Sequence, residues 1–462
     1  MNKPLRPPTL PRRRLLQWGG AWAGLHASGL ARAQPAPEAA AEGPEPPRLA
    51  LLIGNREYPD GDDLPPIHKN VHDLAAALEK RGFTVTQGLD LDLAQARATL
   101  DAFAAQVKAA PADATVFFYF SGHGAQVDAE NLLVSARTSP RARPDTLARG
   151  SLALGTTVLE ELPHRPSGLT IAVIDACRTS LRDVAKGDGL NQVEAPPGCL
   201  VAFATGAGKP AIAPADDTRN TFYTASLVKL LGSSSDEISF SDLFRLVKYD
   251  VQNTMLNHPV ALLRQFAQFP FIAENTQVQR RLAPRQAAAA AAAPPRFASR
   301  DEAADWARLE ATWWPADVAR LAGEFRANHP GSRLADSAEV ARVGATEAAQ
   351  TLRRRDVSLF RSAFEPLPEV ALSAAEVAKA GRGDKDAAAR LARLWGLRSG
   401  RYDINRYEGW LEYAAALGNG IASYELALHC RRNGEPLRAD QYESRARELG
   451  YTPPPSLDNV RK

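Results

Sequence analysis

The sequence predicts an α/β protein with a mostly parallel sheet, followed by an all-α region. Three observations predict this organisation. Between residues 49 and 273, short apolar runs closed by Gly, Ser, Asn or Cys alternate with segments of helical periodicity. Beyond residue 300, apolar residues recur only at intervals of three and four. Near the end of the chain, a helical pattern repeats after 35 residues, from Gly383 to Gly418.

Residues 1–33 predict an export signal. "PRRRLLQ" supplies Arg12 and Arg13, "WGGAWAGLHASGL" is a short apolar stretch, and "ARAQ" offers a small-residue cleavage site after Ala33. The segment resembles a twin-arginine signal peptide, which implies a periplasmic or secreted protein. The apolar stretch is too short and too polar for a stable transmembrane span. A disordered basic tail and an uncleaved anchor stay open as alternatives.

Composition describes an ordinary globular chain. Of the 462 residues, 45% are hydrophobic and 24% are charged, which is enough core for two or three domains. Six basic residues and no acid lie in residues 1–33, so the net charge of +3 becomes −3 without them. This balance argues against nucleic acid as a partner. The three cysteines are too few for a disulfide scaffold.

After a Pro- and Ala-rich linker at 34–47, residues 48–273 alternate strand and helix patterns. Strands separated by helices favour crossover units, and therefore a parallel sheet covered on both faces. The predicted strands are "LALLIGN", "FTV", "ATVFFYFSGHG", "GLTIAVIDAC", "GCLVAFATG" and "QFPFI", and the predicted helices are "NVHDLAAALEKRGF", "LAQARATLDAFAAQVKAA", "FYTASLVKLL" and "ISFSDLFRLVKYDVQNTML".

An Ala- and Pro-rich linker at 274–300 precedes a helical region at 301–353 and a repeat region at 370–452. "GDKDAAARLARLW" aligns with "GNGIASYELALHC". A period in the mid-thirties is typical of helix-turn-helix solenoids, and this one resembles Sel-one-like repeats of the tetratricopeptide class. The resemblance implies a surface for a protein partner. A helical bundle that packs only on itself is an equally weighted alternative.

Two chemically active residues follow predicted strands. His123 stands between two glycines in "YFSGHGAQ", where we expect an exposed turn, and Cys177 ends "VIDAC". Catalytic groups of open parallel sheets gather at this edge. The spacing of 54 residues fits one crossover between neighbouring strands. No His or Cys pair has the spacing of zinc ligands, so a metal hydrolase is not favoured.

From about Arg48 to Ala273 the chain resembles the caspase-like cysteine peptidases, bacterial metacaspases and paracaspases among them. "RLALLIGNREY", "VFFYFSGHGAQVDAENLLV" and "TIAVIDACR" carry the resemblance in the family's order. It implies a three-layer α/β/α sandwich and protein or peptide substrates. It also implies Cys177 as the nucleophile, His123 as the general acid and base, and the main-chain N–H groups of Gly124 and Cys177 as oxyanion-hole donors.

The resemblance also implies specificity. Asp175 stands two residues before the cysteine, where metacaspases and paracaspases carry a pocket acid, and Asp73 matches a second one. Two carboxylates select Arg or Lys and repel acidic side chains. Local backbone hydrogen bonding is the alternative role for both, and Asp216 and Asp217 are weaker candidates.

Arg178, Thr179 and Ser180 replace the His-Ser-Gly that is typical of metacaspases after the cysteine, which puts calcium activation in doubt. We therefore predict no cofactor and no metal site. Arg182 and Lys186 are candidate self-cleavage sites. The competing hypothesis is a catalytically silent scaffold whose repeats bind partners, for instance through pairing of Cys177 with Cys199.

Overall fold

The computed structural model describes residues 46–178, 190–206, 211–283, 297–367, 370, 373–396 and 400–452, with the side chains of residues 177 and 178 outside this description. All of these residues belong to one unit, Pro44–Lys462. The predicted export signal lies outside the described residues. Within them, no helix is long and apolar enough to cross a membrane.

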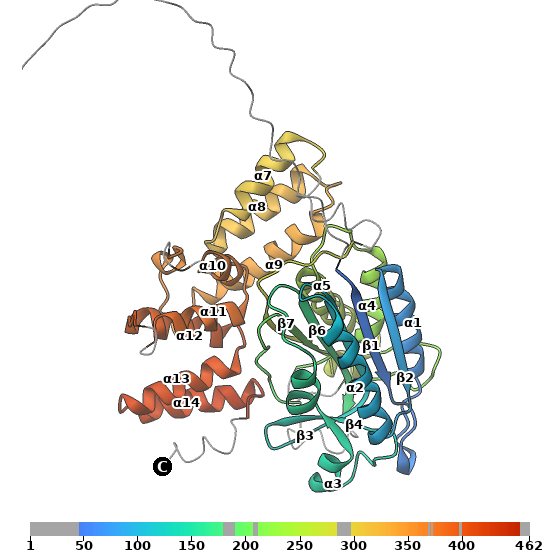
Figure 1. Ribbon diagram of the computed structural model, residues 1–462. Coiled ribbons are helices and arrows are strands. Elements are labelled where there is room, and N and C mark those ends of the chain that lie inside the picture. Colours follow the sequence, from blue (N-terminus) through green and yellow to red (C-terminus); the bar gives the residue numbers. More distant parts are fainter. Residues whose placement is uncertain are drawn as a thin grey trace, which may run out of the picture. The chain divides into compact units, whose positions relative to one another are not determined.

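The described residues form one eight-stranded sheet with neighbours in the order β2-β1-β3-β6-β7-β8 (Figure 1). Neighbours are parallel from β2 to β7, and β8 is antiparallel to β7. A short antiparallel extension joins β4 to β3 and β5 to β4. The strands are β1 (Arg48–Gly54), β2 (Phe83–Leu89), β3 (Thr115–Val127), β4 (Glu130–Val134), β5 (Ser151–Ala153), β6 (Leu169–Arg178), β7 (Cys199–Phe203) and β8 (Phe271–Asn275).

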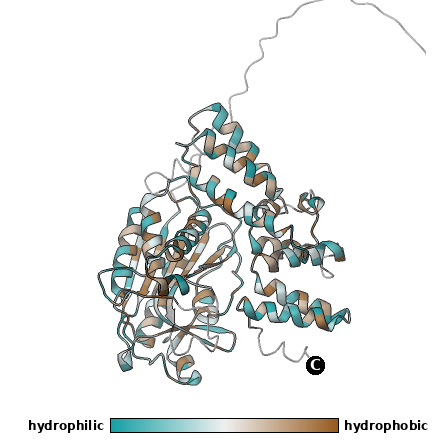
Figure 2. Cartoon of the chain, turned by 180° about the vertical axis from the view of Figure 1, so that it is seen from behind, coloured by the Kyte–Doolittle hydropathy of each residue, from teal (hydrophilic) through white to brown (hydrophobic). Residues whose placement is uncertain are grey.

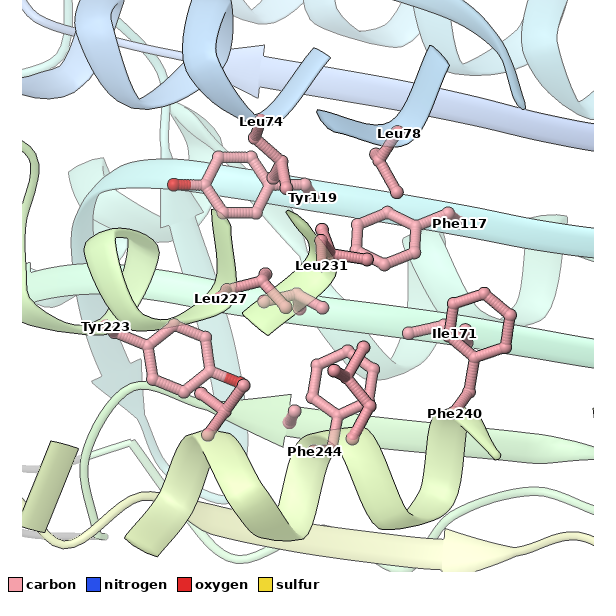
Figure 3. Packing of buried hydrophobic residues seen from close by; sticks show 14 of the residues in the cluster. Leu74, Leu78, Phe117, Tyr119, Ile171, Tyr223, Leu227, Leu231, Phe240 and Phe244 are labelled. Carbon is pink, nitrogen blue, oxygen red and sulfur yellow. The ribbon is translucent and has the colours of Figure 1, made fainter. Parts of the chain in front are cut away.

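Helices cover both faces of the sheet because alternate residues of each strand are apolar on both sides. Phe117 and Tyr119 of β3 face α1, α4 and α5, as Figure 3 shows, whereas Val116 and Phe118 face α2. The strands are accordingly mostly brown in Figure 2. The predicted three-layer α/β class is confirmed. The helices are α1 (Ile67–Lys80), α2 (Leu93–Ala109), α3 (Pro144–Arg149), α4 (Phe222–Ser233), α5 (Phe240–Leu256) and α6 (Ala261–Gln265), with the short turns η1 (Pro59–Gly61) and η2 (Leu154–Leu159).

Two sequence-based expectations for this part of the chain are corrected. Strand β3 does not end in an exposed turn at "SGHG": it continues to Val127, and His123 is buried. The turn signal failed because this stretch pairs with β6 on one side and, from Gly124 onward, with β4 on the other. The predicted linker also starts too early, since β8 reaches Asn275 and Leu282 is fully buried in the core.

The C-terminal region is helical throughout its described residues. Gly383 and Gly418 both have positive φ angles, and each precedes a helix-capping side chain, Asp384 for α11 and Asn419 for α13. The 35-residue sequence period therefore has a structural counterpart. The helices are α7 (Arg300–Glu310), α8 (Pro315–Asn328), α9 (Ala335–Thr351), α10 (Ser373–Gly381), α11 (Lys385–Leu394), α12 (Ile404–Ala416), α13 (Gly420–Arg432) and α14 (Pro436–Glu448), with the short turn η5 (Arg361–Phe364).

Helix α11 packs on the last strand of the sheet. The Asp386 carboxylate accepts a hydrogen bond from the Glu274 N–H at 2.9 Å, and Arg390 donates to the Glu274 carbonyl at 2.7 Å. Edge strands expose unpaired main-chain groups of this kind. The helical region therefore satisfies part of the β8 edge with side chains.

A buried charge cluster joins the same elements. Arg245 of α5 lies 2.9 Å from the Glu274 carboxylate and 3.0 Å from that of Asp384. Both carboxylates are nearly inaccessible, with side chains 2% and 5% exposed. Burial alone would raise the pKa of Glu274, but Arg245 and Lys379 hold it well below its usual value. Arg245 is thus shared by two buried acids, and Lys379 lies 3.7 Å from the carboxylate of Glu274.

Replacing Arg245 with alanine is expected to lower the free energy of unfolding by about 3–5 kcal/mol, because it removes the cation that two buried carboxylates share. Urea unfolding at pH 7 measures the loss. Arg219→Ala is the matched control, since the Arg219–Asp216 pair is 70% and 40% exposed; because exposed ion pairs contribute little, that change should leave the free energy of unfolding nearly unchanged. Equal losses in the two variants would contradict the role given to Arg245.

Because the folded-state pKa of Glu274 is depressed, the stability that its ionised form contributes is present above its unfolded pKa of about 4.3. This stability is lost as the pH falls through the lower folded pKa. Part of the stability gap between the parent and Arg245→Ala should therefore close in acid. Unfolding curves at pH 3 and pH 7 measure this change.

Candidate active site

The pairing of β3 with β6 brings the two predicted catalytic residues to adjacent positions. His123 is the in-register partner of Cys177, and Gly124 is the partner of Arg178. Paired strands lie about 4.8 Å apart, so the two backbones are neighbours at one edge of the sheet. The sequence predicted this juxtaposition from the spacing of the two motifs, and the register provides it.

His123 is held from two sides. Its Nε2 lies 2.7 Å from the main-chain oxygen of Asp62. Because a carbonyl oxygen only accepts, Nε2 carries the proton in the neutral ring and Nδ1 is the basic nitrogen. The Tyr58 ring packs edge-on against the imidazole, with centroids 4.6 Å apart. These contacts fix both the tautomer and the orientation of a buried imidazole.

Tyr58 also binds the backbone at this position. Its hydroxyl accepts a hydrogen bond from the His123 N–H at 3.0 Å and donates to the Val134 carbonyl at 3.1 Å. A Cβ at Gly122 would lie 2.6 Å from that hydroxyl, and one at Gly124 would lie 2.9 Å from the Ala176 Cβ. Both glycines that flank the histidine are therefore required by close neighbours.

Replacing Tyr58 with phenylalanine is expected to lower kcat about tenfold with little change in KM, because the backbone at His123 loses an acceptor while the ring contact remains. Hydrolysis of the best peptide substrate measures this split. Tyr402→Phe is the control, because Tyr402 is 49% exposed. An unchanged kcat in Tyr58→Phe would contradict the positioning role.

Asp175 is fully buried and stands two residues before Cys177 on β6. Its Oδ2 accepts hydrogen bonds from the hydroxyls of Thr221 and Thr224, the latter at 2.6 Å. Its Oδ1 has no hydrogen-bond partner among the described residues. Burial raises the pKa of Asp175, although these hydroxyls oppose the rise. One oxygen of a deeply desolvated carboxylate is thus left to accept from another group.

Asp73 approaches the same region from α1. Its carboxylate lies 2.9 Å from Lys69 Nζ and accepts from Asn220 Nδ2 at 2.8 Å. Burial acts to raise the pKa of Asp73, but Lys69 and Asn220 outweigh it, and the pKa is lowered. Asn220 is followed in the chain by Thr221, which binds Asp175. The two predicted pocket acids are therefore held by consecutive residues.

The known proteins to which this chain is similar match the part that contains the sheet. The model of the caspase domain family matches residues 47–280, just over half of the chain. The chain belongs to the caspase domain family. Among solved structures, caspase-1 from Spodoptera frugiperda matches with 18% identity and a TM-score of 0.38, over 51% of this chain and 92% of that chain. No curated protein matches significantly.

Family membership makes the chain a cysteine-peptidase type of hydrolase and implies protein substrates. The other residues predicted for this caspase domain are not brought to the site by the described structure. Arg182 and Lys186 lie outside the described residues. The carboxylate of Asp216 forms an ion pair with Arg219, with Oδ2 and Nη2 2.8 Å apart, and Asp217 is exposed. Among the described residues, no group of three or more His, Cys, Asp or Glu could hold a metal ion.

The suggested pairing of Cys177 with Cys199 is wrong. Cys199 starts β7 opposite Thr170, at the far end of β6 from Cys177. Seven residues of strand separate the two positions, which is about 23 Å at about 3.3 Å per residue. A disulfide requires Cα atoms within about 7 Å. Burial also raises the pKa of the Cys199 thiol to about 12, so this cysteine is a core residue.

Four contributors to the caspase-domain site were missed in the sequence. Tyr58 stands in "GNREY", which carried the family resemblance without an assigned role, and Thr221 and Thr224 stand in "NTFYT", at the start of a predicted helix. The main-chain oxygen of Asp62 had no signal at all, because a carbonyl is present at every residue. Only the folded register shows which carbonyl meets the imidazole.

Proposed function

We propose that this chain is a cysteine endopeptidase that cleaves proteins after Arg or Lys. The observation that carries the proposal is the in-register pairing of His123 with Cys177, with the imidazole oriented by the Asp62 carbonyl. A buried histidine with a fixed tautomer, directly beside a strand-end cysteine, fits acyl transfer better than a packing role.

In this mechanism the Cys177 thiolate attacks the scissile carbonyl carbon, and the carbonyl oxygen becomes an oxyanion. Main-chain N–H groups of Gly124 and Cys177 stabilise that charge. His123 Nδ1, which has taken the proton of the Cys177 thiol, gives that proton to the leaving amine as the C–N bond breaks, which leaves a thioester on Cys177. It then takes a proton from water, and the hydroxide so formed releases the acid product and the thiolate.

Asp175 and Asp73 support basic specificity. A guanidinium or ammonium group would satisfy Asp175 Oδ1 and restore a counter-charge to a buried carboxylate. Asp73 adds an ionised carboxylate, since its pKa is lowered. An acidic substrate side chain would meet repulsion from the same groups.

The proposal is tested with reduced mature protein and fluorogenic peptides that end in Arg, Lys, citrulline or Asp, with and without calcium. We expect Arg and Lys peptides to be cleaved at least about 10²-fold faster than the Asp peptide, because like charge at a buried site costs several kcal/mol. Preferential cleavage after Asp would keep the peptidase and discard the pocket. No cleavage of any peptide would favour the scaffold hypothesis, in which the repeats bind partner proteins.

Basic specificity also makes Arg182 and Lys186 candidate self-cleavage sites. The parent should then convert to two fragments on a denaturing gel, and the Arg182→Gln/Lys186→Gln variant should stay intact while it still cleaves peptides. Fragments of the same size in both would contradict these sites.

We further propose export to the bacterial envelope through residues 1–33. The twin-arginine pattern at Arg12 and Arg13 supports this location. The test is cell fractionation of the full chain and of its Arg12→Lys/Arg13→Lys variant. Equal distribution of both between cytoplasm and periplasm would contradict the route.

A further inference from the structure

The segment Leu190–Glu194 follows Cys177 by thirteen residues and is bound by the helical repeats. Asn191 and Gln192 are both buried, at 6% and 7% exposure. Most of their polar contacts with the helical region come from the turns that end α12 and α14 and from the start of α13. A segment close to the nucleophile in sequence is therefore held by a part of the chain more than 200 residues away.

Gln192 uses every polar atom of its side-chain amide. Nε2 donates to the Gly418 carbonyl at 3.1 Å and to the Leu449 carbonyl at 2.7 Å, and Oε1 accepts from the Gly420 N–H at 2.9 Å. Its main-chain N–H donates to the Gly450 carbonyl at 3.0 Å. Glutamine fits this arrangement because one amide group presents two donors and an acceptor together.

Asn191 connects the same repeats to the caspase domain. Its Oδ1 accepts from the Thr452 N–H at 2.8 Å, and its main-chain N–H donates to Asn131 Oδ1 of β4 at 2.6 Å. Asn131 Nδ2 donates back to the Asn191 carbonyl at 3.0 Å. Glu194 pairs with Arg393 of α11. The segment is thus fastened between the repeats and the strand that flanks β3.

The binding residues form a regular surface. We call the turns at Gly383, Gly418 and Gly450 the turn row; each of these glycines has a positive φ. The first turn leads into α11, whose Asp386 binds the β8 main chain, and the second and third bind Gln192. Equivalent turns of the helical region therefore bind two segments of the caspase domain, in the way that solenoids build extended binding surfaces.

Leu190, which precedes the bound residues Asn191 and Gln192, lies beside Gly124 of the candidate active site. Its two Cδ atoms lie 3.4 and 3.5 Å from where a Cβ would stand on Gly124, the residue after His123. It packs at the edge of the core formed by Phe120, Ala176 and their neighbours. Any shift of residues 190–192 would therefore move a side chain that fills the space beside the Cα of the proposed oxyanion-hole residue.

We propose that the turn row binds residues 190–194 in cis and that Gln192 is a positioning residue for the catalytic site, acting through Leu190 and Gly124. The positioning role rests on the proposed peptidase function, whereas the binding of the segment does not. In this proposal the helical repeats hold the active site of the same chain in position because their turn row binds residues 190–194.

The test is Gln192→Met in the full mature chain, because methionine keeps the length of the side chain and removes its hydrogen bonds. Gln350→Met on the exposed side of α9 is the matched control. Two quantities are measured: kcat and KM for an Arg peptide, and amide hydrogen exchange at Gly420 and Gln192. We expect kcat to fall at least about fivefold with KM within twofold, and exchange at Gly420 to accelerate at least about tenfold, with no change in Gln350→Met.

Gly420→Ala tests the same contact from the repeat side. Alanine is favourable near the start of a helix, but its Cβ would stand 3.0 Å from Gln192 Oε1 and 2.9 Å from the Tyr451 Cβ. The same loss of kcat in this variant supports the proposal even if Gln192→Met does not fold.

Three outcomes would count against the inference. Unchanged exchange at Gly420 in Gln192→Met overturns the binding of the segment. Faster exchange with unchanged kcat overturns the positioning role and leaves only a structural contact. A parent protein that cleaves no peptide overturns the positioning role together with the proposed function, while the exchange data still decide whether the turn row binds the segment.

Discussion

Cys177→Ala is expected to abolish peptide hydrolysis, by about 10⁶-fold or down to the background of the assay, because removing the nucleophile of an acyl-transfer enzyme removes the chemistry itself. We expect the variant to fold, since the change removes one sulfur atom and adds neither bulk nor charge. The measurement is kcat/KM for the best Arg or Lys peptide, with circular dichroism and thermal unfolding as checks on folding.

His123→Gln is the companion variant. Glutamine can still donate a hydrogen bond toward the Asp62 carbonyl but cannot transfer protons near neutral pH, so we expect a loss of about 10²–10⁴-fold, mainly in kcat. Cys199→Ala is the matched cysteine control, because Cys199 is buried at the far end of β6 and β7. Activity in Cys177→Ala equal to that of Cys199→Ala would assign the chemistry to another group.

The sequence was sufficient to predict the strands β1, β2, β3, β6, β7 and β8 and the placement of His123 and Cys177 on neighbouring strands. Apolar runs such as "VFFYF" specify buried parallel strands on their own, and the spacing of His123 and Cys177 left one crossover between them. The register then follows from the alternation of core residues on the two faces, since a slip of one residue would turn Phe117 and Tyr119 to the wrong side.

The supporting groups were not predictable for physical reasons. The tautomer of His123 depends on a carbonyl at Asp62, and carbonyls carry no residue-type signal. The buried carboxylate of Asp175 accepts hydrogen bonds from the hydroxyls of Thr221 and Thr224, which lie in a segment distant in sequence. Contacts between the repeats and residues 190–194 join surfaces that periodicity describes only as polar turns.

Substrate recognition gives the second large effect. Asp175→Asn keeps the shape of the side chain and an oxygen to accept from Thr221 and Thr224, but it removes the charge. We expect kcat/KM for the Arg peptide to fall about 10²-fold, the scale of a charge-assisted hydrogen bond in a desolvated site. The citrulline peptide, which is uncharged and nearly the same shape, should be affected much less.

The ratio of kcat/KM for Arg over citrulline is therefore the decisive quantity. It should collapse toward one in Asp175→Asn and fall less in Asp73→Asn, because Asp73 is partly exposed and already paired with Lys69. It should stay at the parental value in Asp216→Asn, whose partner is Arg219. A parental ratio in Asp175→Asn would show that this carboxylate has only a structural role.

The pH dependence of the free energy of unfolding tests the role of Asp175 independently of activity. Because burial raises the folded-state pKa of Asp175, its protonated form favours the folded state, and that contribution is lost as the pH rises from about 4, the unfolded value, through the folded pKa. Asp175→Asn carries no such pH-dependent loss, so its stability relative to the parent should improve as the pH rises. A buried carboxylate of this kind costs stability when it ionises, and the proposed substrate cation would offset that cost.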